Sequence, residues 1–339
     1  MKILKSLFAI LLCVLALNAN ARDWSLYNSY INSYYDGQKI VVNDSNSRAQ
    51  AFGMFFTLVQ KDQEKFDQIL SFVEKNLAKD DLQNQLPNAV ENTDGTDLLA
   101  NFFIAYNLLN AAAIFENKSY EEKAQLIIDN LSKQSLILEV NGFGKVFAQS
   151  SNAQKGEFTI SPSNYPLFVL EKLDTYNSSF KELFQGTLSA IVKGSVDGYV
   201  ADDITFNFDS ALVVKPSSLG FKDAAMYYLW LGMTSDATPN KRLMAPLYKN
   251  YFKTIVKELS VAKKADTFEH ELTGMGDFGY DACMLLNATN KEKDFLRSKL
   301  KAHNYKKDEY QNLVLAMFAL GIDEQRFVID ANGSIIVGE

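Results

Sequence analysis

Cysteine is scarce in this chain of 339 residues, which contains only Cys13 and Cys283. Cys13 lies in an apolar stretch near the start of the chain, which is lost if that stretch is a cleaved export signal. The processed chain then keeps Cys283 alone, so an intramolecular disulfide is excluded. The fold must be held by its apolar core, and a chain of this length buries a large fraction of its surface.

Histidine is equally scarce, because His270 and His303 are the only two and neither belongs to a cluster with zinc-ligand spacing. Glycine-rich loops that hold phosphate are missing as well. We therefore expect no metal and no cofactor. The formal net charge is −7, and losing Lys2 and Lys5 with the signal changes it to −9. An acidic chain is a poor partner for nucleic acid or anionic lipid, so neither is expected.

The first 21 residues have the organisation of a secretory signal. Lys2 and Lys5 form the charged start, Leu7 to Leu17 the apolar centre, and Ala19-Asn20-Ala21 a small-residue cleavage site. We predict cleavage after Ala21 and a periplasmic protein with no membrane insertion. The alternative is an uncleaved anchor, for which the apolar run is short.

Helical periodicity dominates the remaining sequence. After Asp62, for example, Phe66, Ile69 and Leu70 lie on one stripe, while Leu98 to Phe115 is apolar nearly all round and predicts a buried helix. Many of the predicted helices begin with Ser, Thr or Asp, the favoured N-cap residues. No linker divides the chain, so residues 22–339 are expected to form a single domain. About twelve helices are predicted, beginning near Asp23, Ser47, Asp62, Thr96, Ser119, Ser163, Ser178, Phe221, Pro239, Gly276, Lys291 and Asp308.

Two segments break the helical pattern. Residues Gly198 to Val214 alternate polar and apolar side chains, which predicts a short strand pair between helices. Residues Phe327 to Val337 carry Asn332-Gly333 between apolar runs, which predicts a hairpin with a two-residue turn. The expected fold class is therefore all-α, with a small β insertion and a C-terminal β-hairpin.

Five motifs follow one another in a recognisable order. They are Trp24-Ser25-Leu26-Tyr27, Ser47-Arg48-Ala49-Gln50-Ala51-Phe52-Gly53-Met54, Ile104-Ala105-Tyr106-Asn107-Leu108-Leu109, Ser161-Pro162-Ser163-Asn164-Tyr165-Pro166, and Asp223-Ala224-Ala225-Met226-Tyr227-Tyr228-Leu229-Trp230-Leu231-Gly232-Met233. Together they resemble the signatures of glycoside hydrolase family 8, the family of the periplasmic endoglucanase of bacterial cellulose synthesis. The resemblance implies an (α/α)6 barrel, in which six helical hairpins surround a centre.

The resemblance also implies a catalytic pair of which half is missing. The family signature Ser-Glu-Gly-Gln-Ser-Tyr-Gly-Met has its proton-donating Glu where this chain has Arg48, and a guanidinium is no general acid near neutral pH. Asp223 matches the family's base, but inverting hydrolysis needs both carboxyl groups. Met226 replaces a family Arg, and Asn101 replaces an acid. The candidate substrate-binding residues are Gln50, Asn101, Tyr106, Tyr165 and Tyr199.

The same residues have structural interpretations. A carboxylate such as Asp223 suits a helix N-terminus, and Arg48 suits an ion pair with Asp44 or Asp223. Trp24 and Trp230 lie on apolar helical stripes and are expected in the core, although exposed aromatic rings are what a sugar platform requires. If the proton donor has moved, the candidate acids are Glu157, Asp202, Asp203 and Asp281.

Three functions fit these patterns. The favoured one is a periplasmic family 8-like pseudoenzyme that serves as a scaffold or interaction component of an envelope assembly, with a protein as its partner. The second is an active endo-β-1,4-glucanase-type hydrolase with a relocated acid and Asp223 as its base. The third is a non-catalytic glycan-binding protein that uses the former cleft.

Overall fold

The structure is a computed structural model that describes residues 24–42, 46–195, 200–216, 223–244, 247 and 277–338. The predicted signal, residues 1–21, lies outside the described residues, and so do Asp44 and Tyr199. Within those ranges, no helix combines the length and the apolar composition needed to cross a membrane.

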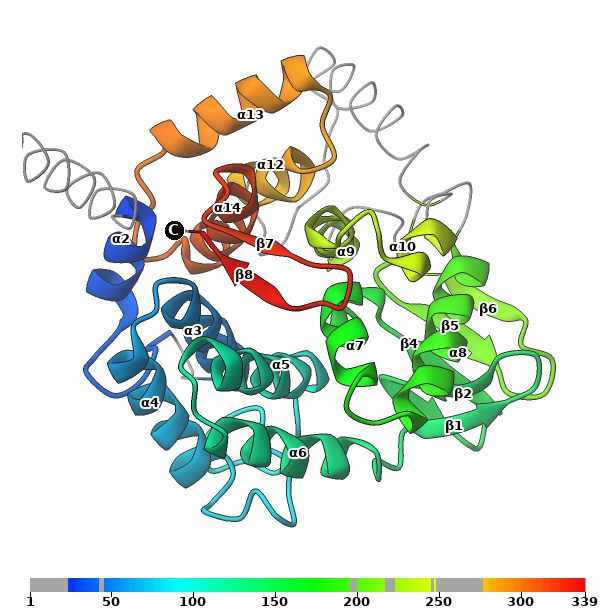
Figure 1. Cartoon of the computed structure of the whole chain (residues 1–339). Helices are drawn as coiled ribbons and strands as arrows, with labels where there is room; N and C mark the ends of the chain where they lie inside the picture. Colours follow the sequence, from blue (N-terminus) through cyan, green and yellow to red (C-terminus); the bar gives the residue numbers. More distant parts are fainter. Residues whose placement is uncertain are drawn as a thin grey trace, which may run out of the picture.

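Inner and outer helices alternate along the chain (Figure 1). The inner ring consists of α3 (Ser47–Val59), α5 (Leu98–Ile114), α7 (Leu167–Asp174), α9 (Asp223–Met233), α12 (Asp277–Leu285) and α14 (Tyr310–Asp323). The outer helices are α2 (Ser25–Tyr34), α4 (Gln63–Phe72), α6 (Ser119–Leu131), α8 (Ser179–Gly194), α10 (Pro239–Leu243) and α13 (Asn290–Ala302). This arrangement is an (α/α)6 barrel, which confirms the predicted fold.

The inner helices are apolar nearly all round because they face both the centre and the outer layer. Phe318 of α14 lies at the centre, with its ring centroid 5.3 Å from Phe52 and 4.8 Å from Phe56 of α3. Trp230 packs edge-on against Phe318 at 5.3 Å. Trp24 is buried against Phe56 in the same way, at 6.0 Å. The prediction that both tryptophans belong to the core is confirmed.

The β structure is larger than the sequence indicated. The predicted strand pair is present as β5 (Ile204–Asn207) and β6 (Val213–Pro216), but it extends a four-stranded antiparallel sheet with β3 (Ser150–Asn152) and β4 (Glu157–Ile160). A further hairpin of β1 (Ile137–Val140) and β2 (Gly144–Phe147) precedes it. The strand β3 is short, polar and fully exposed, so it carries no alternation that would reveal it.

The C-terminal hairpin is confirmed, with a different turn. Strands β7 (Phe327–Ile329) and β8 (Ile335–Val337) pair antiparallel, and the Asp330 amide donates to the Ser334 carbonyl at 3.0 Å. Gly333 adopts a φ of +75°, so Ala331, Asn332 and Gly333 form a three-residue loop of the kind that places a glycine in the left-handed region. The expected two-residue turn was therefore wrong.

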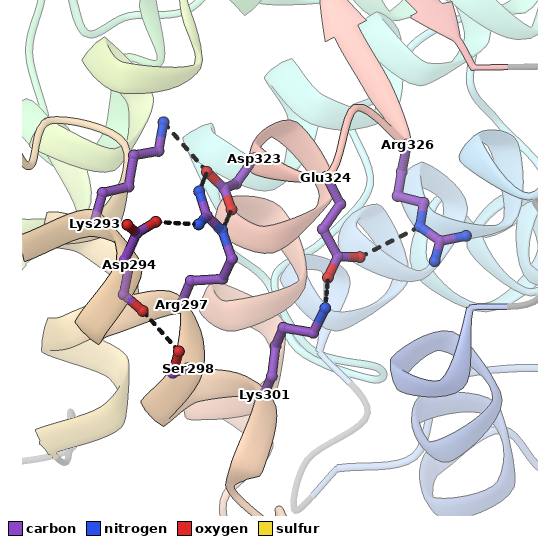
Figure 2. Close-up of polar contacts among 8 residues, drawn as sticks. All are labelled: Lys293, Asp294, Arg297, Ser298, Lys301, Asp323, Glu324 and Arg326. Carbon is purple, nitrogen blue, oxygen red and sulfur yellow. Dashed lines mark hydrogen bonds and ion pairs between the residues drawn. The ribbon is translucent and has the colours of Figure 1, made fainter. Parts of the chain in front are cut away.

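The outer helix α13 is attached to α14 largely through charges (Figure 2). Arg297 binds both carboxylate oxygens of Asp323, with Nη2 3.0 Å from Oδ1, and Lys293 lies 3.2 Å from the same Oδ1. Lys301 and Arg326 both contact Glu324. On α12, which lies beneath α13, Cys283 is fully buried, and burial raises the pKa of its thiol.

Candidate active site

The inner helices α3 and α5 are neighbours, and their first residues, Ser47 and Leu98, lie at the same end of the barrel. Asn46 caps α3, because its Oδ1 accepts the Ala49 amide at 2.8 Å. Asp97 caps α5 in the same way, accepting the Ala100 amide at 3.0 Å. Short polar side chains at these positions satisfy amides that have no partner within the helix. We call this end of the inner ring the open end.

Arg48 lies in the first turn of α3 and reaches across to the start of α5. Its Nε and Nη2 atoms are each 2.9 Å from Oδ2 of Asp97. The Arg48 side chain is 38% exposed and that of Asp97 is 19% exposed. Arg48 is in an ion pair as expected, and the described partner is Asp97, which the sequence did not indicate. Asp44 and the side chain of Asp223 lie outside what the structure describes, so pairing with either stays a prediction. The Arg48 cation is therefore paired with a carboxylate, and its correspondence to the family's acid stays a prediction from the motif.

The segment between η1 (Val73–Leu77) and α5 lies over these helix ends. The Ser47 amide donates to the Ala89 carbonyl at 2.8 Å, which gives the first amide of α3 a partner. Asn101 donates from Nδ2 to the carbonyls of Pro87, at 3.1 Å, and of Asp97, at 2.9 Å. This segment thus connects α3 to α5 and holds the two charged residues in register.

Two of the candidate substrate-binding residues act as internal amides. Gln50 is buried, its Oε1 accepts the Ile40 amide, and its Nε2 donates to the Ile40 carbonyl, both at 2.8 Å. Asn101 is also buried and is engaged with backbone carbonyls as described above. Neither side chain has surface that a sugar can reach in this structure.

The two described tyrosines among the candidates are buried as well. Tyr165 donates its hydroxyl to the Phe147 carbonyl at 2.8 Å, and burial raises the pKa of that hydroxyl. Tyr106 packs against Phe103 and Phe168, with centroid distances of 6.2 and 5.5 Å. The geometry gives both rings packing roles, and a contact with substrate stays a prediction for them.

Three of the four alternative acids are engaged in other contacts. Asp202 accepts the Ala224 amide at 2.9 Å and so caps α9, whose first residue is Asp223. Asp203 accepts a hydrogen bond from the Ser161 hydroxyl, and Asp281 is paired with Lys299. Glu157 lies on β4, in the cross-strand row with Asn152 and Asn207.

Some features of the open end were not found from the sequence. The side chain of Asp223 and all of Tyr199 lie outside what the structure describes, so their predicted roles stay predictions. The role of Asp97 was missed, although an Asp directly before a long apolar run is an N-cap signal. Within the described ranges, no cluster of three or more His, Cys, Asp and Glu side chains is arranged to hold a metal ion.

Comparisons with known proteins cover nearly the whole chain. The family model described as glycosyl hydrolases family 8 matches residues 3–325. An endoglucanase from Escherichia coli is 23% identical to this chain in an alignment 358 residues long. The alignment covers 99% of this chain and 97% of that protein.

Two solved structures share the fold. An endo-1,4-D-glucanase from Vibrio fischeri superimposes with a TM-score of 0.76 at 23% identity, covering 93% of this chain and 99% of that one. The endo-β-1,4-glucanase CMCax from Acetobacter xylinum superimposes with a TM-score of 0.64 at 14% identity, covering 89% and 97%. With the barrel and the motif order already established, the match to the family model settles the assignment: the chain belongs to family 8 of the glycosyl hydrolases.

Proposed function

We propose that this chain is a family 8 protein that no longer hydrolyses glycans and that acts as an interaction component of an envelope assembly in the periplasm. The observation that carries the proposal is the Arg48–Asp97 ion pair. Inverting hydrolysis requires a carboxylic acid that protonates the leaving oxygen. By the motif match, Arg48 stands where the family has that acid, and a guanidinium is no general acid near neutral pH.

Three of the four alternative acids support the same conclusion. Asp202 is used to cap α9, Asp203 accepts from Ser161, and Asp281 is paired with Lys299. A general acid needs access to the leaving oxygen, whereas these three carboxyl groups are engaged in contacts within the protein. The fold thus retains its core while its polar open end has changed.

The first test is an assay of the chain from Arg22 to Glu339 on carboxymethylcellulose and cello-oligosaccharides. We expect no release of reducing ends above the level given by an Asp223→Asn variant. Turnover that this substitution abolishes would contradict the proposal, because it would show a working base with an acid elsewhere.

A second test replaces the cation itself. Arg48→Glu places a carboxyl group beside Asp97, and two adjacent carboxylates raise the pKa of one of them, as a general acid requires. Met226 and Asn101 still differ from the family pattern, so we expect this single change to restore little activity. Robust cellulase activity from Arg48→Glu would overturn the view that several positions have been lost.

The competing function is an active endo-β-1,4-glucanase-type hydrolase with a relocated acid. It is favoured by relatives described as endoglucanases that match this chain over nearly its full length. It predicts that Asp223→Asn abolishes turnover while the thermal unfolding temperature is unchanged. Under the favoured proposal, by contrast, crosslinking in the intact cell envelope should capture a protein partner in an assembly, and the same partner should be captured with Asp223→Asn.

A further inference from the structure

A pocket lies beside the Arg48–Asp97 pair, where the segment before α5 meets the end of β2. The polar groups of the pocket are the amides of Gln134 and Gln149 and the hydroxyl of Thr96. Its apolar walls come mainly from Leu86, Leu98, Leu136 and Phe147. Leu98 directly follows Asp97 in the chain, so the pocket opens on the same end of the barrel as the ion pair. No charged side chain is among the residues that line it.

The size of the pocket limits what can enter it. The volume of the pocket is about 50 Å³. One water-sized group needs about 10–15 Å³, so about four heavy atoms fit. A pyranose ring is too large, and a single hydroxyl leaves the apolar walls unfilled. The occupant is therefore a short substituent of a larger molecule that stays outside.

The two amide side chains offer one free carbonyl oxygen and one free amide nitrogen. Gln134 donates from Nε2 to the Asn130 carbonyl at 2.9 Å, which leaves its Oε1 free. Gln149 accepts at Oε1 from Asn164 Nδ2 at 2.6 Å, which leaves its Nε2 free. Neither free atom has a partner within the described part of the chain. Since the hydrogen-bonding partners fix the orientation of each amide, the two free atoms are chemically distinct.

We propose that this pocket binds the acetamido group of an N-acetylated amino sugar in a glycan. An acetamido group has one N–H donor, one carbonyl acceptor, a methyl group and about four heavy atoms, so it matches both glutamines, the apolar walls and the room available. The hydroxyl of a glucose unit would place a polar group against leucines at a cost. The ammonium group of a deacetylated sugar would find no carboxylate among the lining residues.

This inference rests on one part of the proposed function, the loss of hydrolysis, and adds to it that the open end binds a glycan. The backbone of the bound glycan lies over the start of α5, next to Arg48 and Asp97. Because both of these side chains are partly exposed, they are available to sugar hydroxyls there. The acetamido pocket then selects which glycan binds at the open end.

The test compares three trisaccharides that differ in one substituent: the N-acetylglucosamine trimer, the glucosamine trimer and cellotriose. In calorimetry with the full processed chain, we expect the acetylated trimer to bind at least tenfold more tightly than the other two. In saturation-transfer NMR, its acetyl methyl protons should receive the strongest signal. Equal affinities for the three sugars, or no binding at millimolar concentration, would overturn the proposal.

Variants locate the site. Gln134→Leu and Gln149→Leu keep the side-chain volume and should each weaken binding of the acetylated trimer about tenfold. Gln185→Leu on α8 is the matched control and should bind as the unmodified chain does, because Gln185 lines a different hollow. An effect of Gln185→Leu equal to that of the two pocket variants would refute the location. Cleavage of the bound trimer would refute the proposed function and leave the pocket in place.

Discussion

The two ends of the inner ring are built from the same helices and are finished differently. At the far end, the β7–β8 hairpin closes the barrel: the Ile335 amide donates to Asn110 Oδ1 of α5 at 2.8 Å, and Lys172 of α7 donates to Ser334 at 2.8 Å. At the open end, α3 and α5 are joined by N-caps, an ion pair and an overlying segment. The closed end is fixed by close packing and buried contacts, whereas the open end carries partly exposed polar groups that are free to change. The proposed loss of an enzymatic acid would be tolerated at such an end because the fold does not depend on it.

The substitution Gly333→Ala should destabilise the closed end most. Gly333 has a φ of +75°, and an added Cβ would lie too close to the carbonyl oxygen of Phe168. The strain and the clash together should cost about 3 kcal/mol of unfolding free energy, measured in urea. Gly142→Ala is the control. Gly142 also has a positive φ, +85°, but a Cβ added there would have its nearest neighbour, Cβ of Ala211, 4.0 Å away. Its cost should be about 1 kcal/mol. Equal losses for the two variants would mean that the hairpin does not seal the barrel.

Asp323, at the closed end of α14, should give the next largest effect. Its side chain is 1% exposed and is shared by Arg297 and Lys293 (Figure 2). Asp323→Asn should destabilise the fold by about 2 kcal/mol, since it weakens the bonds to two cations. Asp294→Asn is the control: it also contacts Arg297 but is 77% exposed, so its effect should stay below about 0.5 kcal/mol.

The same network predicts a dependence on pH. Burial alone raises the pKa of Asp323, but hydrogen bonds from Arg297 and Lys293 outweigh burial and hold the pKa below its usual value. Its contribution to stability is therefore complete above the unfolded-state pKa of about 4 and is lost as the pH falls through the lowered folded-state value. Urea unfolding between neutral and acidic pH should show this loss, and Asp323→Asn should lose less stability over the same interval. Parallel pH curves for the two proteins would contradict this assignment.

The smallest expected effect is at the open end. Arg48→Gln and Asp97→Asn each remove one charge, and Asn keeps the ability to cap α5. The coupling energy from the double-mutant cycle should be about 0.5 kcal/mol and should fall as salt is added, because the pair is partly exposed. A coupling above about 2 kcal/mol would make this pair as important to the fold as the closed end.

The sequence predicted the parts of the molecule that depend on periodicity and local capping. The apolar stripe after Asp62 became α4, and the all-round apolar run from Leu98 became the inner helix α5. The hairpin was found from Asn332-Gly333, but its loop length was not, because pairing of Asp330 with Ser334 decides the register. Local patterns therefore specify elements better than they specify their connections.

The polar contacts were harder to predict because they join residues that are distant in sequence. Arg48 and Asp97 lie 49 residues apart and meet only once α3 and α5 have packed. The motif places Gln50 among the candidate sugar-binding residues, yet its side-chain amide pairs with the backbone of Ile40. A buried amide and an exposed amide look the same in a sequence, so only the packing around Gln50 distinguishes them.

The buried thiol of Cys283 has a practical consequence for following these comparisons. Burial keeps it protonated and out of contact with alkylating reagents while α12 stays packed, since the thiolate is the reactive form. Its labelling rate therefore reports how often the barrel opens around α12 in native buffer. The labelling rate of Cys283 can therefore be used to compare local unfolding among the variants described above, with no probe added to the chain.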